Sequence, residues 1–234
     1  MNQTMRQKLR KILMAGAVAT CLVPTWSASG EGSARDEEFR YDWQLRNFVG
    51  AVAGLFLPNQ GEGSLTFKTE TNGHLRTELT ITSGASREGE YFRYGSEIDT
   101  KTLQPIRAWS SYSWRGESKS KSEDIDRKGV LDIASGIYAI RHNPPTKPRR
   151  MEIWSDGKIY PVVVMVLGSE TRKVGSQNVE TRHFSVRGID VEGQRKWKGH
   201  LDLWLANDDA ATPVGILFSR NLADVRMDLK PLTP

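Results

Sequence analysis

The chain has 234 residues, of which 38% are hydrophobic and 26% charged, and its formal net charge is +5 at pH 7. Residues 1–30 hold four of the 33 lysines and arginines and none of the 28 acidic residues, so the rest of the chain is nearly neutral. A nucleic-acid-binding domain normally carries a basic surface of its own, and we expect no nucleic-acid partner. The single cysteine, Cys21, lies within residues 1–30, and a domain of about 200 residues buries enough core to fold without disulfides.

The first thirty residues have the pattern of a secretory signal peptide. Four basic residues precede an apolar stretch at 12–23, and small residues follow it. This order of zones is typical of an exported chain, and the stretch is shorter than the roughly 20 apolar residues that span a bilayer. We predict cleavage after Ser29 or Gly30 and a location in the periplasm or cell envelope. The alternatives are a retained membrane anchor and a lipid on Cys21, which Thr20 disfavours because a smaller residue normally precedes a lipidated cysteine.

Beyond the signal peptide, apolar and polar residues alternate with period two in a long series of short runs. Such alternation is typical of strands with one buried face, and Asn72-Gly73 between two of the runs is a hairpin signal. About ten strands are more than a flat open sheet usually carries without curling. The sequence therefore predicts a mainly β fold, a strongly curved antiparallel sheet or half-open β-barrel, in a single domain over 39–234 that follows a flexible segment at 31–38.

Four segments qualify this pattern. Gln44–Leu57 has apolar residues at helical spacing, and Asp132–Arg141 has an apolar stripe behind a plausible N-cap, so we expect one or two helices packed on the sheet. The run 159–167 is apolar on both faces, which predicts a strand covered on both sides. The run 118–126 alternates serine with lysine and glutamate, which indicates a charged edge strand.

Candidate catalytic and metal-binding residues are few. His200 and Asp202 stand two apart on a predicted strand and share a face, as two metal ligands could. A metal site needs three or four ligands and no third is evident, so a solvated strand face is the favoured interpretation. Asp208-Asp209 is interpreted as a turn, because adjacent strand residues point to opposite faces. We expect no catalytic residue, no metal and no cofactor.

Tryptophan is abundant, and six of the seven tryptophans lie after residue 30. Trp204 stands out because alternation places it on the face of His200 and Asp202, away from the leucines of the same strand. A tryptophan there either packs beneath another element or lines a cavity, and curved sheets hold ligands in their mouths.

Spaced motifs run along most of the chain. They are Phe39-x-Tyr41-x-Trp43, Asp132-x-x-Ser135-x-x-Tyr138-x-x-Arg141, Trp154 followed by Gly157-Lys158-x-Tyr160, and Trp204-x-x-x-Asp208-x-x-x-x-Pro213-Val214. Together, from about Phe39 to Leu229, they resemble the exported bacterial family known as domain of unknown function 3108. The resemblance implies a curved antiparallel sheet with a packed helix and an envelope location, and it brings no established activity. The segment 44–57 departs from it as an insertion in the first hairpin.

Three classes of function remain open, in this order of preference. The first is a non-enzymatic envelope protein that binds or carries a lipid or other hydrophobic ligand in a sheet-lined cavity. The ligand-contacting residues predicted for it are Phe48, Val52, Phe56, Tyr138 and Trp204. The first three would form a mobile lid and the last two the cavity wall.

The second class is a structural or scaffolding protein of the envelope with a filled core. It predicts a protein partner bound through an exposed apolar patch, for which the segment 45–57 is the candidate, and 44–57 could also make peripheral contact with a membrane. The third class is an enzyme such as a hydrolase, which would need His200 and Asp202 beside further polar groups in a pocket.

Overall fold

The computed structural model describes residues 36–46, 60–83, 89–220 and 223–231. The predicted signal peptide with Cys21, and the predicted lid residues Phe48, Val52 and Phe56, lie outside the described residues. Within the described ranges, no helix has the length and apolar character that crossing a membrane requires.

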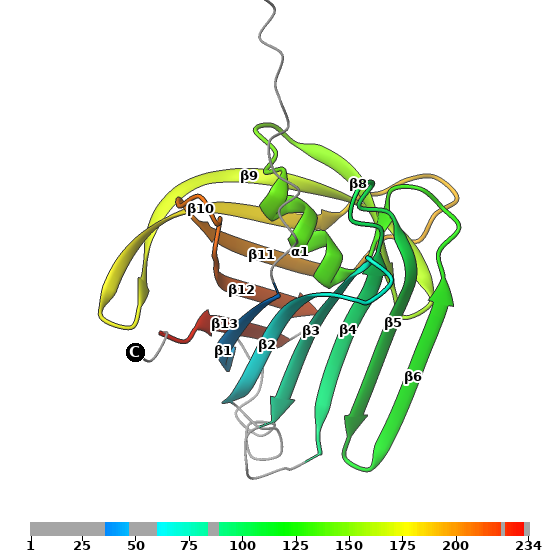
Figure 1. Ribbon diagram of the computed structural model, residues 1–234, viewed down its shortest axis with the longest axis horizontal. Coiled ribbons are helices and arrows are strands. Elements are labelled where there is room, and N and C mark those ends of the chain that lie inside the picture. The colour runs from blue at the N-terminus through cyan, green and yellow to red at the C-terminus, as the bar shows by residue number, and fades with distance from the viewer. Residues whose placement is uncertain (1–35, 47–59, 84–88, 221–222, 232–234) are drawn as a thin grey trace, which may run out of the picture. The chain divides into compact units, whose positions relative to one another are not determined.

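The described chain forms one 13-stranded sheet and one helix (Figure 1). The strands before the helix are β1 (Glu37–Arg46), β2 (Gln60–Thr69), β3 (Leu75–Ser83), β4 (Tyr91–Ile98), β5 (Pro105–Trp114), β6 (Glu117–Asp124) and β7 (Val130–Leu131). The helix is α1 (Ile133–His142). The strands after it are β8 (Arg149–Ser155), β9 (Lys158–Val174), β10 (Gln177–Gly188), β11 (Gly199–Ala206), β12 (Pro213–Arg220) and β13 (Ala223–Leu229).

Two antiparallel meanders meet at the middle of the sheet. The strand order is β6-β5-β4-β3-β2-β1-β13-β12-β11-β10-β9-β8-β7, so β1 pairs with β13 and the sheet ends at β6 and β7. All neighbouring strands are antiparallel except β7 and β8. The prediction of a strongly curved, unclosed antiparallel sheet is confirmed. The strand number exceeds the expected ten, and β7 was not predicted because it has only two residues, too few to show an alternation.

Helix α1 lies on the inner, concave face of the sheet (Figure 1) and packs against β3, β4, β7 and β8. Asp132 is its N-cap, as predicted: the carboxylate accepts the amide hydrogens of Ala134 and Ser135. The same carboxylate accepts the hydroxyl of Ser96 on β4 at 2.6 Å. Asp132 is fully buried, and this burial raises the pKa of its carboxyl. One side chain thus both starts the helix and fastens it to the sheet.

The predicted helix over Gln44–Leu57 is wrong at its start, because Gln44 to Arg46 belong to β1. Their backbone pairs with β13, with Leu45 opposite Val225, and this long-range pairing overrides the local helical spacing. The rest of that segment lies outside the described residues. The last two residues of the segment 31–38, which was expected to be flexible, belong to β1, because this strand begins at Glu37.

Three further strand predictions can be compared with the structure. The edge strand is confirmed as β6, and the hairpin at Asn72-Gly73 joins β2 to β3, with Gly73 at a φ of 82°. The expected cover on both faces of 159–167 holds for the start of the run and fails at its end. Val162 and Val164 are buried on the inner face, and on the other face Pro161 is buried and Ile159 packs on a second buried cluster, whereas Leu167 is 51% exposed.

Candidate functional site

The inner face of the sheet is the apolar interior of the molecule, and α1 fills its middle. Buried side chains from both meanders line it: Tyr41, Leu65, Phe67, Leu79, Val164, Phe184, Leu203, Ile216 and Met227. A cavity of about 20 Å³ lies between α1 and strands β8, β10 and β11, bordered by Ile137, Ile153 and Trp197. That volume is near the minimum that holds one water molecule. Any ligand of the inner face therefore has to enter where α1 leaves the face open.

The Tyr138 opening is the first such place, at the last turns of α1. It has a volume of about 350 Å³, with Phe67 and Leu75 among its apolar walls. The ring of Tyr138, a predicted ligand contact, meets Phe67 edge-on at 5.0 Å. Arg141 donates two hydrogen bonds to Glu37, at 2.5 and 2.7 Å, and its side chain is only 6% exposed. The charges of Arg141 and Glu37 in this opening are therefore paired with each other.

The Trp197 opening is the second, between the β8–β9 hairpin and the loop 189–198. Its volume is about 490 Å³, and its lining residues are Ser155, Asp156, Tyr160, Arg195, Lys196, Trp197, Lys198 and Gly199. Trp197 is buried although it lies in a loop, because Gly188 and Gly199 leave room for it; a Cβ at Gly199 would stand 2.5 Å from the indole. Trp197 was not among the residues predicted from the sequence, where its only signal is a lone tryptophan between these two glycines in a polar stretch.

Half-buried aromatic rings continue from Trp197 across the inner face. Phe218 of β12 lies 6.2 Å from Trp197 and 6.5 Å from Tyr94 of β4, so the contact bridges the two meanders. Phe92, one alternation further along β4, lies 5.9 Å from Tyr112 and 5.4 Å from Trp114. We call Tyr94, Phe218, Phe92, Tyr112 and Trp114 the aromatic layer. All five are partly exposed. Phe92 and Tyr94 precede Ser96 on the inner face of β4, Tyr112 and Trp114 lie on β5, and Phe218 lies on β12.

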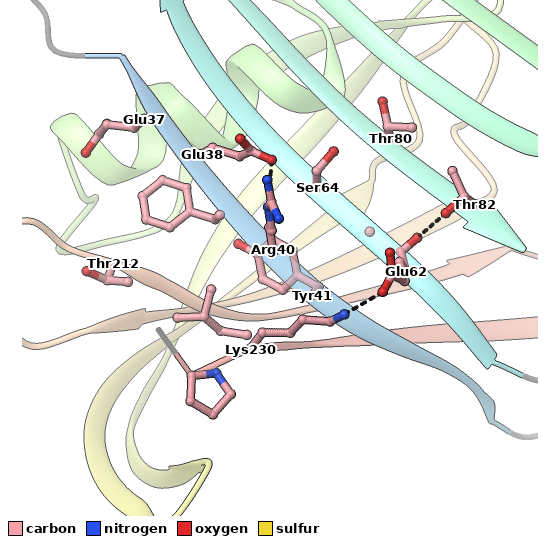
Figure 2. Close-up of a pocket in the computed structure, with 14 residues that line it drawn as sticks. Glu37, Glu38, Arg40, Tyr41, Glu62, Ser64, Thr80, Thr82, Thr212 and Lys230 are labelled. Atoms are coloured by element: carbon pink, nitrogen blue, oxygen red, sulfur yellow. Dashed lines mark hydrogen bonds and ion pairs between the residues drawn. The ribbon is translucent and has the colours of Figure 1, made fainter. Parts of the chain in front are cut away.

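A larger hollow of about 950 Å³ lies beside β1, β2 and the end of β13 (Figure 2). Its charges are paired: Lys230 binds Glu62 at 2.7 Å, and Arg40 binds Glu38 at 2.9 Å. The hydrogen bond from Lys230 lowers the pKa of Glu62. Glu37 borders both this hollow and the Tyr138 opening. With its charges compensated and its walls mostly polar strand faces, the hollow is a poorer candidate for an apolar ligand.

Trp204, the other described ligand-contact candidate, lies on the outer face of β11. The β9–β10 hairpin extends beyond β11 as an arm that curves toward β13 (Figure 1), and Val174 and Val179 of the arm pack on Trp204. The guanidinium of Arg172 lies 4.1 Å from the indole centroid and binds Asp228 of β13 at 2.8 Å. Tyr138 and Trp204 therefore stand on opposite faces of the sheet and do not line one cavity.

His200 and Asp202 share the outer face with Trp204, as alternation predicted. His200 Nε2 lies 2.9 Å from the Asp202 carboxylate and 3.2 Å from Ser185 Oγ. A serine–histidine–aspartate relay uses both ring nitrogens, one for each partner, whereas here both contacts fall on Nε2. His183 Nε2 lies 3.5 Å from the same carboxylate. Among the described residues, no group of three or more histidine, cysteine, aspartate or glutamate side chains is placed to hold a metal ion.

The motif residues found in the sequence have structural contacts. Asp132 caps α1, and its partner Ser135 completes a capping box. Trp154 on β8 donates to Glu123 on β6 at 2.9 Å, which joins the two ends of the sheet. Asp208 closes the turn before β12 by accepting from Thr212. These contacts hold helix α1, the two ends of the sheet and the turn before β12 in place, and none of them places a reactive group in an opening.

Comparison of the sequence with protein families identifies one match. The model described as "Protein of unknown function (DUF3108)" matches residues 40–230. The chain belongs to this family. The DUF3108 match covers both meanders and α1, so the family corresponds to the whole described sheet. No curated protein sequence matches the chain.

Solved structures with a similar arrangement are distant. A β-barrel-like protein of domain of unknown function DUF1849 from Brucella abortus has 11% identity and a TM-score of 0.44, with 82% of this chain and 94% of that chain covered. The hypothetical lipoprotein YmcC from Escherichia coli has 8% identity and a TM-score of 0.41, with 84% and 87% covered. The lipoprotein LppX from Mycobacterium tuberculosis has 10% identity and a TM-score of 0.28, with 84% and 88% covered.

Proposed function

We propose that this DUF3108 protein binds a lipid or other elongated hydrophobic molecule on the inner face of its curved sheet. The observation that carries the proposal is the aromatic layer with Trp197. Most large apolar side chains of the described chain are buried, and only Ile106 and Leu167 count as exposed. The rings of the aromatic layer are instead partly open on the concave side, where the sheet curves around them.

The position of the layer suggests how a ligand binds. Space beneath α1 is too small for an alkyl chain, so the chain of the ligand lies along the aromatic layer and reaches the surface at the Trp197 opening. That opening falls within the roughly 300–1,000 Å³ of typical ligand sites. Aromatic side chains bury a large apolar area with few rotatable bonds, which favours binding of an acyl chain at low entropic cost.

Binding can be measured with N-phenyl-1-naphthylamine, an uncharged dye that fluoresces in apolar sites, and with monopalmitoylglycerol as the competitor. We expect the purified protein to enhance the dye's fluorescence and the lipid to displace it. Replacing Phe218 by serine removes the ring that bridges the meanders. We expect this change to weaken both affinities about tenfold, since burying an aromatic side chain against the ligand contributes at least about 1.4 kcal/mol of binding free energy.

The matched control is Trp109→Ser. Like Phe218, Trp109 is a half-buried aromatic residue, but it lies on the outer face of β5. There its indole N–H donates a hydrogen bond to Glu78, and the guanidinium of Arg76 stacks over its ring. Its replacement should leave both affinities within about twofold. Absence of dye binding by the folded wild-type protein, or equal losses in the two variants, would count against a site on the inner face.

Scaffolding is less well supported by the described residues. Leu45, part of the proposed docking patch, is half-buried on the inner face of β1, packed on the core. Ile106 and Leu167 lie on separate strands, β5 and β9. The described surface thus provides no broad apolar patch of the kind that marks a permanent partner.

We also propose that the protein acts in the cell envelope after removal of its first thirty residues. The support is the order of basic, apolar and small residues at the N-terminus. Mass spectrometry of the protein isolated from its own cells should give a chain that begins at Gly30 or Glu31, without a lipid on Cys21. A chain that retains residues 1–30 would overturn this placement.

A further inference from the structure

The three openings described above differ in charge. The Tyr138 opening and the hollow beside β1 and β2 contain both acidic and basic residues, and the arginines and lysine there form ion pairs. The Trp197 opening contains Arg195, Lys196 and Lys198, and its only carboxylate is that of Asp156. Lys196 binds Asp190 at 2.7 Å, whereas Arg195 and Lys198 form no side-chain ion pair or hydrogen bond with another described residue.

Further basic residues lie on the other side of Asp156. A small cavity of about 40 Å³ is lined by Lys119 and Lys121 of β6 together with Tyr94 and Tyr112 of the aromatic layer. Asp156 borders both spaces and accepts a hydrogen bond from Ser110 of β5 at 3.0 Å. The end of the inner face that carries the aromatic layer is therefore also bordered by lysine and arginine residues from both meanders.

We infer that the ligand is an anionic amphiphile, whose acyl chain lies on the aromatic layer and whose acidic head group, a phosphate or carboxylate, is bound by Arg195 and Lys198 at the Trp197 opening. This inference rests on the proposed function and adds the chemical class of the ligand. An unpaired guanidinium next to an apolar surface is a preferred partner of phosphate and carboxylate oxygens, because it forms paired, charge-assisted hydrogen bonds. Trp197 and Tyr160 supply amphipathic rings at the boundary between chain and head group.

The test compares two lipids with the same palmitoyl chain, lysophosphatidylglycerol, which is anionic, and lysophosphatidylcholine, which is zwitterionic. Each lipid is titrated, below its micellar concentration, against N-phenyl-1-naphthylamine bound to the purified protein. We expect wild type to bind the anionic lipid about 25-fold more tightly, since Arg195 and Lys198 near an anionic head group each contribute roughly a factor of five. The variant Arg195→Gln/Lys198→Gln should reduce this preference to about twofold, and high salt should narrow it in wild type.

The matched control is Lys68→Gln/Lys101→Gln, which removes the same charge at exposed positions that line neither opening. It should keep the wild-type preference. Equal binding of the two lipids by wild type would overturn the inference and leave the proposed function intact, whereas binding of neither would overturn both. Glycerol phosphate that binds as tightly as the anionic lipid would indicate a free-anion site and would also overturn it. So would a preference that survives in the Arg195→Gln/Lys198→Gln variant.

Discussion

Replacing Asp132 by alanine is expected to lower the free energy of unfolding by about 4 kcal/mol. The change removes an N-cap, which costs about 1–2 kcal/mol, and strands buried partners of the carboxylate at roughly 1–3 kcal/mol each. The cost of the cap covers the amides of Ala134 and Ser135, and the further buried partners are the hydroxyls of Ser96 and Ser135. Because nine of the ten residues of α1 are buried, loss of its anchor also loosens the packing on the inner face. Urea unfolding followed by circular dichroism measures the effect.

The control, Asp132→Asn, keeps the size and an acceptor oxygen and isolates the role of charge. Burial raises the pKa of the Asp132 carboxyl in the folded protein above its ordinary value. As the pH rises from about 4, the carboxyl of the unfolded chain loses its proton first, while the native state still holds it. Wild type should therefore lose stability relative to Asp132→Asn between about pH 4 and the raised pKa, and the difference should then level off. A difference that grows in favour of wild type over this range would contradict a buried, desolvated carboxylate.

The Glu37–Arg141 pair is expected to show the second large effect. In Glu37→Gln, the guanidinium of Arg141 stays buried at 6% exposure without its counter-charge, and we expect a loss of about 3 kcal/mol in the free energy of unfolding. In the double variant Glu37→Gln/Arg141→Met, the apolar side chain replaces the charge against Phe39 and Phe67, whose rings the guanidinium now covers. This variant should recover to within about 1 kcal/mol of wild type.

The neighbouring Glu38–Arg40 pair provides the control for these variants. Glu38 is paired with Arg40, whose side chain is 72% exposed, so Glu38→Gln should change stability by less than about 0.5 kcal/mol. Chemical denaturation of the four proteins at one pH gives all the values. If Glu37→Gln and Glu38→Gln cost the same, the Arg141 guanidinium is hydrated in solution and the Tyr138 opening is wetter than the structure indicates.

Much of the fold could be predicted from the sequence because its signals are local. Alternation along β2 and β3, the Asn72-Gly73 turn and the cap at Asp132 each act within a few residues. The helix predicted over Gln44–Leu57 failed where a distant strand decided the outcome, since Gln44 lies opposite Arg226 in the sheet. Local spacing does not contain such a pairing.

The candidate site was predicted less well for a related reason. Tyr138 was predicted as a cavity-wall residue on a helix that does face the interior, and it does line an opening. Trp204 was correctly assigned to the face of His200, but the arm that covers it is formed by residues more than twenty positions away. The aromatic layer depends on the curvature that brings Tyr94 near Phe218. Alternation assigns a residue to a face but does not indicate which distant strand that face meets.

The pairing of β1 with β13 has a consequence for how the chain is made. Tyr41 and Leu229 are partners in the sheet although almost the whole domain lies between them in sequence. During synthesis, β1 can pair with β2 at once, but its other edge keeps unpaired backbone groups until the final strand appears. Such late, long-range closure slows folding and leaves an aggregation-prone edge exposed meanwhile. Truncation before β13 removes the junction of the two meanders, so a nascent chain becomes a complete sheet only with its last strand.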